Sequence, residues 1–260
     1  AEGLAHSGVK ELIVIAQDTT YYGLDLYGER RLGDLLRRLC RIDGIEWLRL
    51  HYAYPAQFPD DVIGAMRDEP KICKYLDIPF QHISDSQLKS MRRGLDKAET
   101  YALVEKRRRE VPGIALRTTF IAGFPTETEE EYEALKDFLR CARFENCGFF
   151  AYSREEGTPA YRLKGQVHHA TKERRVRGLY AVQEALSRER LNGFVGHSVK
   201  VLCDGVDFEK GCFTGHAAFQ TYDVDGKVYF TAPKAETGKY YDVLVERADE
   251  ADLYGQAKER

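Results

Sequence analysis

Hydrophobic and polar positions alternate between strand-like and helix-like patterns along the first 152 residues of the chain. Short apolar runs predict five strands, at residues 11–16, 47–52, 75–80, 114–122 and 148–152. Helix-length segments separate these runs, and in one of them a single helix face carries Leu32, Leu35, Leu36, Leu39 and Cys40. Strands that alternate with helices predict parallel βα units, with a barrel or a doubly wound sheet as the candidate folds.

The pattern changes in the last third of the chain. Residues 169–193 predict one long, highly charged helix, and short β-type runs follow at 199–202, 227–231 and 240–245. Asp-Gly and Thr-Gly turn signals separate these runs. We therefore expect an α/β barrel-type domain at residues 1–168, a connecting helix at 169–194 and a small all-β barrel at 195–260.

Polar residues follow nearly every predicted strand of the first domain. The clusters occupy residues 17–20, 54–55, 81–82, 123–125 and 153–156. Because the carboxyl ends of parallel strands meet at one edge of a sheet, we expect these clusters to lie together. That layout is typical of a barrel-type active site.

The fourth predicted strand ends at Gly123 and leads into a strongly acidic segment. Thr126 with Glu129, and Thr128 with Glu131, fit the capping-box pattern of a helix start. The carboxylates of residues 127–131 also complement the positive end of the helix dipole, so we assign them a mainly structural role. The loop itself is either a plain turn or a ligand site.

Composition narrows the function classes. The formal net charge is −3, and no apolar run approaches the roughly 20 residues that cross a bilayer, so we expect a cytoplasmic chain with no membrane partner. The six cysteines are scattered without a C-x-x-C spacing, which predicts free thiols in a reducing cytosol and no metal site in this chain.

The predicted β domain is acidic. Residues 195–260 contain eight Lys or Arg against twelve Asp or Glu, a formal charge of −4. A module that grips phosphate backbones should be basic, so this charge favours a basic protein partner. A solvated surface without a partner would show the same charge.

Four segments in this order resemble the radical S-adenosylmethionine methylthiotransferases. They are IAQDTTYYGLDLYG (15–28), YLDIPFQHISDSQLKSMRRG (75–94), RTTFIAGFPTETEEEY (117–132) and YSREEGTPAY (152–161). Within that group they are most similar to the RimO type, which modifies a ribosomal protein. The β domain resembles the TRAM module, an OB-like barrel, although the usual D-A-P-E-x-D-G is here QTYDVDG at 220–226.

The resemblance implies a partial TIM-like (βα)6 radical-SAM barrel. Its first strand and the C-x-x-x-C-x-x-C loop for a 4Fe-4S cluster do not occur in this sequence. We therefore expect an amino-terminally truncated fragment that is inactive alone. The implied cofactors are S-adenosylmethionine and two 4Fe-4S clusters in the full-length parent, with no cluster expected in this chain.

The implied activity is transfer of a methylthio group to the β-carbon of an aspartate in small-subunit ribosomal protein number twelve. The acidic TRAM module would bind this basic protein, and Lys89, Arg92 and Arg93 would meet ribosomal RNA.

Three competing functions fit parts of the sequence. A tRNA-adenosine methylthiotransferase belongs to the same family, but those enzymes tend to carry Y-S-P-R-P-G-T where residues 152–158 read YSREEGT. The adjacent Glu155 and Glu156 would repel RNA phosphate and argue against it. A non-catalytic adaptor would dock on the ribosome through the β domain. An ordinary barrel enzyme with acid–base chemistry would have to use Asp18 at a strand end.

The resemblance also assigns cofactor contacts residue by residue, each with a structural alternative. Gln17 and Asp18 would hold the methionine amino group, or Asp18 is a turn cap. The ribose stretch would comprise Gln81, His82 and Ser84, or His82 is structural and Ser84 is an N-cap.

The remaining contacts belong to the last two strands. Arg117, with Thr119 beside it, would meet the methionine carboxylate, because a cation inside a barrel needs an anion; an internal Asp or Glu could equally supply it. Gly123 would let the backbone approach S-adenosylmethionine closely. Tyr152 and Arg154 would face the adenine or the substrate.

Overall fold

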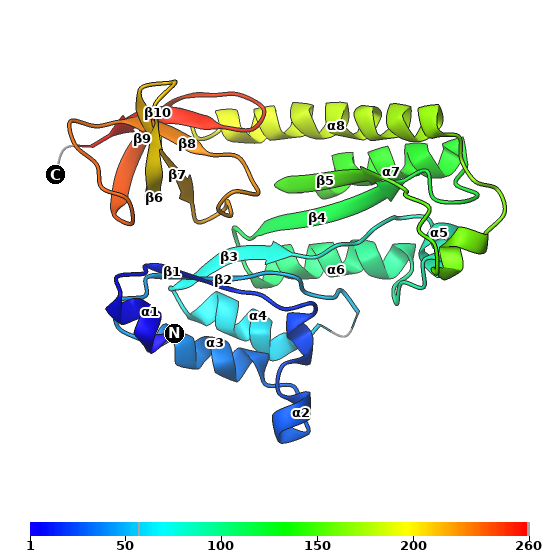
Figure 1. The fold of residues 1–260 in the computed structure, drawn as a ribbon, viewed down its shortest axis with the longest axis horizontal. Helices are drawn as coiled ribbons and strands as arrows, with labels where there is room; N and C mark the ends of the chain where they lie inside the picture. Colours follow the sequence, from blue (N-terminus) through cyan, green and yellow to red (C-terminus); the bar gives the residue numbers. More distant parts are fainter. Residues whose placement is uncertain (57, 259–260) are drawn as a thin grey trace.

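A computed structural model describes residues 1–56 and 58–258 as two domains joined by one long helix (Figure 1). The first domain is built on a parallel five-stranded sheet. Its strands lie in chain order: β1 (Glu11–Val14), β2 (Trp47–Leu50), β3 (Ile72–Asp77), β4 (Ala115–Ala122) and β5 (Asn146–Ala151). All five predicted strands are confirmed. β3 ends before the predicted 75–80 run does, because Pro79 has no amide hydrogen to continue a ladder.

Helices cover one face of this sheet, and the second domain lies at the ends where the strands begin, against the other face, which we call the inner face (Figure 1). The covering helices are α3 (Leu32–Cys40), α4 (Asp60–Asp68), α6 (Lys97–Glu110) and α7 (Glu129–Ala142). Shorter elements are α1 (Glu2–His6), η1 (Thr19–Tyr21), α2 (Leu24–Tyr27), α5 (Asp85–Ser90) and η2 (Pro159–Arg162). Between sheet and helices lies the main core, where the Phe138 ring meets those of Phe120 and Phe144 at 6.0 and 5.4 Å.

Sequence explains where the longest of these helices begin. α7 starts at Thr128, whose side chain accepts a hydrogen bond from the Glu131 amide while the Glu131 carboxylate accepts one from the Thr128 amide. Of the two capping boxes that the sequence allows, this one forms. α6 begins with the equivalent pair Asp96 and Glu99.

The connecting helix is α8 (His169–Asn192), close to the predicted 169–193. After it, five strands close into a barrel in the order β10-β8-β7-β6-β9. They are β6 (Ser198–Asp207), β7 (Cys212–Ala217), β8 (Val228–Thr231), β9 (Tyr240–Ala248) and β10 (Leu253–Ala257). The predicted small β barrel is confirmed, although the sequence pattern missed β7 and β10.

Both missed strands contain a glycine where another strand passes close by. A Cβ on Gly215 would lie 2.3 Å from the Leu202 carbonyl oxygen, and one on Gly255 would lie 2.0 Å from that of Leu244. These positions therefore require glycine, which interrupts the alternation of apolar residues that predicts a strand.

The β barrel packs against the inner face of the sheet through an apolar and a polar layer. The apolar layer joins Trp47, Tyr75 and Ala115 to Leu202 and Phe219. The polar layer is centred on buried charges that pair across the interface, which offsets the cost of removing them from water.

Arg49 and His216 form the centre of this polar layer. Arg49 is fully buried and donates to Glu11 at 2.8 Å and to the Ala218 carbonyl at 2.9 Å. His216 bridges Glu11 and Asp204, the latter at 2.9 Å. Burial alone would raise the pKa of Glu11, but His216 and Arg49 bring it below its usual range. Glu11 thus ties β1 to the second domain.

This arrangement predicts a pH-dependent stability. Burial would lower the pKa of His216, yet its hydrogen bonds to Asp204 and Glu11 raise it to about 9. A raised histidine pKa stabilises the folded state fully below about 6.5, and that stabilisation disappears as the pH rises through about 9. We expect the free energy of unfolding to fall by on the order of 3 kcal/mol between pH 6 and pH 9.5.

Urea unfolding at several pH values measures this effect. His216→Gln should be less stable than the wild type at pH 6 and should lose the dependence between pH 6.5 and 9. His197→Gln, which replaces an exposed histidine of the same domain, is the matched control. A His216→Gln variant with an unchanged pH slope would contradict the assignment.

Candidate functional site

A hollow of about 330 Å³ lies at the carboxyl ends of β3 and β4. Gln81, Ile121 and Phe124 line it from the strand ends, together with residues 90–93 after α5 and residues 158–160 at η2. Its volume is in the range of small-molecule sites in proteins. The segments that follow the third, fourth and fifth strands therefore meet at one place.

Gln81 joins this hollow to the sheet by its backbone. Its amide donates to the Thr119 carbonyl and its carbonyl accepts from the Ile121 amide, both at 2.9 Å. The residue adopts φ +72°, a conformation uncommon for a residue with a side chain. Its Oε1 is buried and accepts no hydrogen bond from the described residues. The side-chain oxygen of Gln81 is thus an acceptor without a partner among the described residues, at the carboxyl ends of the strands.

Two further buried polar atoms lack a hydrogen-bond partner among the described residues, one on a residue that lines the hollow and one on a neighbour of Phe124. One is Nε of Arg93, whose Nη2 donates to the Pro79 carbonyl at 2.7 Å and whose guanidinium lies over the Tyr54 ring. The other is the hydroxyl of Tyr152, whose ring meets Phe124 at 4.9 Å. Burial raises the pKa of Tyr152, so its hydroxyl stays protonated and can donate at neutral pH.

Glu127 organises the loop after β4. Its side chain is fully buried and accepts from the Gly123 amide, from Arg175 Nη1 at 2.6 Å and from His82 Nε2 at 3.1 Å. Arg175, on α8, also donates to Glu129 at 3.0 Å. One carboxylate therefore connects the strand end, the segment before α5 and the connecting helix. The prediction that the carboxylates of 127–131 mainly cap the helix misses this role of Glu127.

Gly123 has φ +73°, which explains the glycine at the strand end. A Cβ there would lie 2.4 Å from Cγ of Lys172, which crosses over the loop from α8. The amino group of Lys172 donates to the Tyr152 carbonyl at 2.8 Å. In this structure the close approach that requires glycine is that of Lys172, and an approach by S-adenosylmethionine stays a prediction.

The first predicted contacts either have internal partners or face solvent. Asp18 caps η1 by accepting from the Thr20 amide at 2.9 Å, and Gln17 is exposed. His82 is buried; its Nε2 donates to Glu127 and its Nδ1 accepts from the Ser84 amide at 3.0 Å. Ser84 occupies the N-cap position of α5, but its hydroxyl donates to Glu131 at 2.7 Å and makes no capping bond to the helix. The turn-cap alternative thus describes the contact of Asp18, and the structural alternative describes the contacts of His82.

Arg154, Thr119 and Arg117 are spread over three places. Arg154 is exposed and donates to the Tyr161 carbonyl at 2.9 Å, and Thr119 contributes its carbonyl to Gln81. Arg117 lies near the start of β4, where Nη1 donates to Asp77 at 3.1 Å and Nε is 3.5 Å from Asp225. The internal carboxylates that the sequence left open as an alternative are present, as Asp77 and Asp225, and the assignment of Arg117 to a cofactor carboxylate stays a prediction.

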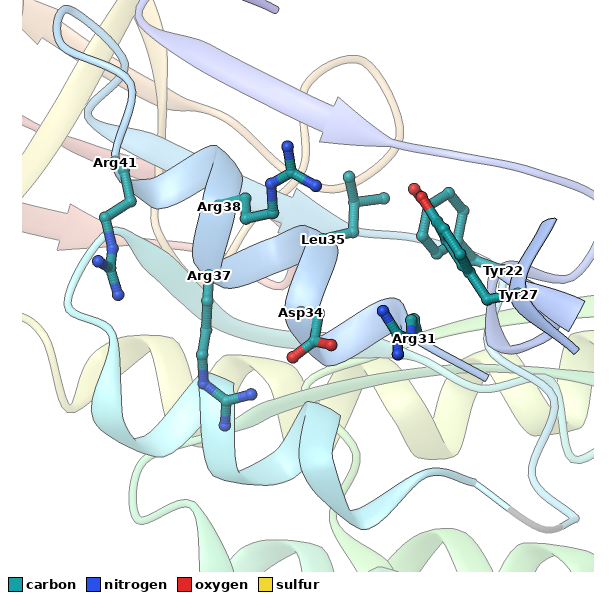
Figure 2. A pocket seen from close by; sticks show the side chains of 8 residues that line it. All are labelled: Tyr22, Tyr27, Arg31, Asp34, Leu35, Arg37, Arg38 and Arg41. Atoms are coloured by element: carbon teal, nitrogen blue, oxygen red, sulfur yellow. The ribbon is translucent and has the colours of Figure 1, made fainter. Parts of the chain in front are cut away.

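A second hollow, of about 380 Å³, lies along the outer surface of α3 (Figure 2). Figure 2 shows Tyr22 and Tyr27 at one end and Arg41 at the other, with Arg37 and Arg38 between them. It contains none of the predicted site residues and is separate from the hollow at the strand ends.

Two structural features bear on cofactors and membranes. Within residues 1–56 and 58–258, no group of three or more His, Cys, Asp or Glu side chains is arranged to hold a metal ion. Among the same residues, none of the helices combines the length and hydropathy that a bilayer crossing requires. The absence of a cluster from this chain stays a prediction.

Comparison with known families decides the assignment. Residues 1–139, more than half of the chain, match the family model of the radical SAM superfamily. The chain belongs to the radical SAM superfamily. Residues 195–257 match the TRAM domain, so the closed β barrel is a TRAM module attached to a radical SAM domain. The predicted combination of a partial radical-SAM barrel and a TRAM barrel is confirmed.

Curated relatives of this radical SAM protein carry a specific name. Proteins named "ribosomal protein uS12 methylthiotransferase RimO" are 46% identical over 259 residues in Lachnoclostridium phytofermentans and 48% identical over 258 residues in Flavobacterium psychrophilum. The alignments cover 99% and 98% of this chain but 59% of each relative. The chain thus spans about three fifths of the length of these relatives.

A solved structure supports the fold. Coproporphyrinogen III oxidase (HemN) from Escherichia coli, described as a radical SAM enzyme, matches with a TM-score of 0.50 at 12% identity. The match covers 72% of this chain and 49% of that protein.

The contacts of Glu127 predict a large loss of stability when its charge is removed. Glu127→Gln would leave Arg175 buried without its closest anion, a change that typically costs about 3–5 kcal/mol. Urea unfolding followed by circular dichroism measures it. Glu130→Gln, which replaces an exposed carboxylate on the adjoining helix α7, is the control and should change the midpoint far less. Equal effects of the two substitutions would exclude the central role of Glu127.

Proposed function

We propose that the full-length protein transfers a methylthio group to the β-carbon of an aspartate in ribosomal protein uS12. The observation that carries this proposal is the identity of 46–48% with RimO proteins along almost the whole of this chain. That similarity includes both the radical SAM domain and the TRAM module, since the alignments extend over 258 or more residues.

S-adenosylmethionine is the cofactor of this proposal, and the hollow at the strand ends suits it. Gln81 and Arg93, which line the hollow, provide one acceptor and one donor without partners among the described residues, and the Tyr152 hydroxyl beside Phe124 provides a second donor. Ile121 and Phe124 provide apolar surface for a base. We assign ligand binding to Gln81, Arg93 and Tyr152, with Gly123 shaping the loop.

The reaction requires a cofactor because its target is an unactivated carbon. An sp³ C–H bond is too strong for side-chain acids and bases, and the bound cofactor would supply the radical chemistry that breaks it. The residues of this chain orient the cofactor and exclude water. The proposal also includes two 4Fe-4S clusters in the full-length protein. Neither cluster is held by this chain.

The acidic TRAM module supports a basic protein as the partner. Its formal charge of −4 would repel phosphate backbones and attract the Lys- and Arg-rich surface of a ribosomal protein. A ribosomal substrate implies a cytoplasmic location. Lys89 and Arg92 are exposed at the end of α5 beside the hollow and are the residues we assign to nearby ribosomal RNA; Arg93 is tied to Pro79 instead.

Mass spectrometry of the products tests the function. The full-length protein with reconstituted clusters is incubated with S-adenosylmethionine, a sulfur source, ribosomes and tRNA. We expect a methylthio mass gain on one aspartate of uS12 and none on tRNA. A gain on tRNA alone would favour a tRNA-adenosine methylthiotransferase, and no gain on either would favour a non-catalytic adaptor.

Tyr152→Phe tests the cofactor site without disturbing the fold. The hydroxyl has no partner among the described residues, so its removal should leave the thermal midpoint unchanged. We expect the Kd for S-adenosylmethionine, measured by calorimetry on the full-length protein, to rise about five- to tenfold through loss of one hydrogen bond. Tyr161→Phe, the same change on the adjoining segment, is the control. Equal affinity in all three proteins would remove Tyr152 from the site.

A further inference from the structure

One loop of the TRAM barrel crosses the inner face of the radical SAM sheet. We call residues 220–226, between β7 and β8, the floor loop; Figure 1 shows it beside the start of β4. Thr221 bonds His51 at 2.9 Å at one end, and Asp225 accepts from the Tyr75 hydroxyl at 2.7 Å at the other. Arg117 adds an ion pair to Asp225. The loop is therefore attached to β3 and β4 and to the residue that follows β2.

The floor loop also has a fixed internal shape. The Thr221 amide donates to Asp225 at 2.9 Å, and Gln220 accepts from the Ala217 amide at 3.1 Å. At the end of the loop, Gly226 passes so close to the Ala251 carbonyl that a Cβ would lie 1.8 Å from its oxygen. Between these braces, Asp223 adopts φ +57°. Such bracing holds the tip in one position instead of leaving it mobile.

The tip of the loop, residues 222–224, is exposed although its flanks are buried. Tyr222 and Val224 are each 54% exposed, whereas the side chain of Asp225 is 2% exposed. Asp223 between them is exposed and has no hydrogen bond or ion pair from its side chain to the described residues. The braced loop therefore presents two exposed side chains and a carboxylate without partners among the described residues.

The tip lines a cleft that lies next to the strand carrying one wall of the hollow. Val224 and Phe150 line a cleft of about 420 Å³ beside β5. Phe150 is 59% exposed and is paired in register with Ile121, so both side chains lie on the inner face. Ile121 in turn lines the hollow that contains Gln81. Phe150 therefore stands between Ile121 of the hollow and the cleft that Val224 of the tip lines.

We propose that Tyr222, Asp223 and Val224 contact the target segment of the protein substrate, and that Asp223 pairs with a basic side chain of that segment. This inference rests on the proposed function. The chemistry of the tip favours an extended segment with a Lys or Arg between apolar residues, because Asp223 is flanked by apolar side chains within an acidic domain. An RNA backbone would be repelled by the same carboxylate.

Site-specific cross-linking tests the contact directly. The full-length protein carries a photoreactive phenylalanine analogue at position 222 or, as the matched control, at Phe208, which is 90% exposed in the β6–β7 turn. With ribosomes present, we expect uS12 cross-links from position 222 and none from position 208. Cross-links to RNA from position 222, or none there, would overturn the proposal.

Kinetics of Asp223→Lys separates substrate contact from a structural role. We expect the KM for uS12 to rise roughly tenfold, because like charges then face each other, with kcat and the thermal midpoint maintained. Phe208→Ala should leave both kinetic constants unchanged. If the wild type modifies uS12 while Asp223→Lys retains its KM, this inference fails and the proposed function stands. If the wild type modifies only tRNA, both fail.

Discussion

The hydrogen bonds and the ion pair of the buried Glu127 carboxylate hold together the segments at the carboxyl ends of the radical SAM sheet. It has no contact with solvent and is satisfied from three directions, by the loop after β4, by His82 and by Arg175 of α8. In a low-dielectric interior a carboxylate is tolerated only when its acceptor positions are filled. The loop, the start of α5 and the connecting helix must therefore take their positions together. The free polar atoms of the candidate site lie next to this fixed framework.

The same principle governs the contact between the two domains. Apolar packing of Trp47 and Tyr75 against the TRAM barrel buries surface, but it does little to fix the orientation of the barrel because apolar contact is non-directional. Orientation comes from paired charges and charge-assisted bonds that cross the interface, such as those of Glu11 with His216 and of Arg117 with Asp225. A rotation of the TRAM barrel would leave several buried charges without their partners at the same time. The interface is thus specific for geometric and electrostatic reasons, in addition to its burial of apolar surface.

Local patterns predicted the elements that depend on local physics. The apolar stripe from Leu32 to Cys40 predicted the helix that is α3, and Thr128 with Glu131 was one of two capping pairs that placed the start of α7. Partners distant in sequence could not be predicted in this way. Arg175 lies 48 residues after Glu127, and Asp225 lies 150 residues after Tyr75, and no periodicity connects them. The partners of Arg117 have the same limit: the sequence shows that a buried cation needs an anion, but not which one.

The crossing of the inner face by residues 220–226 has a consequence for the modular history of the chain. Radical SAM and TRAM modules are recognised as separate sequence families, and domains of that kind are usually exchanged as independent units. Here the loop of one module is complementary to His51, Tyr75 and Arg117 of the other. A TRAM barrel grafted from another protein would keep its own fold. It would not dock on this sheet unless it also carried the equivalents of Thr221 and Asp225. Exchange of either module therefore requires matching residues on both sides of this contact.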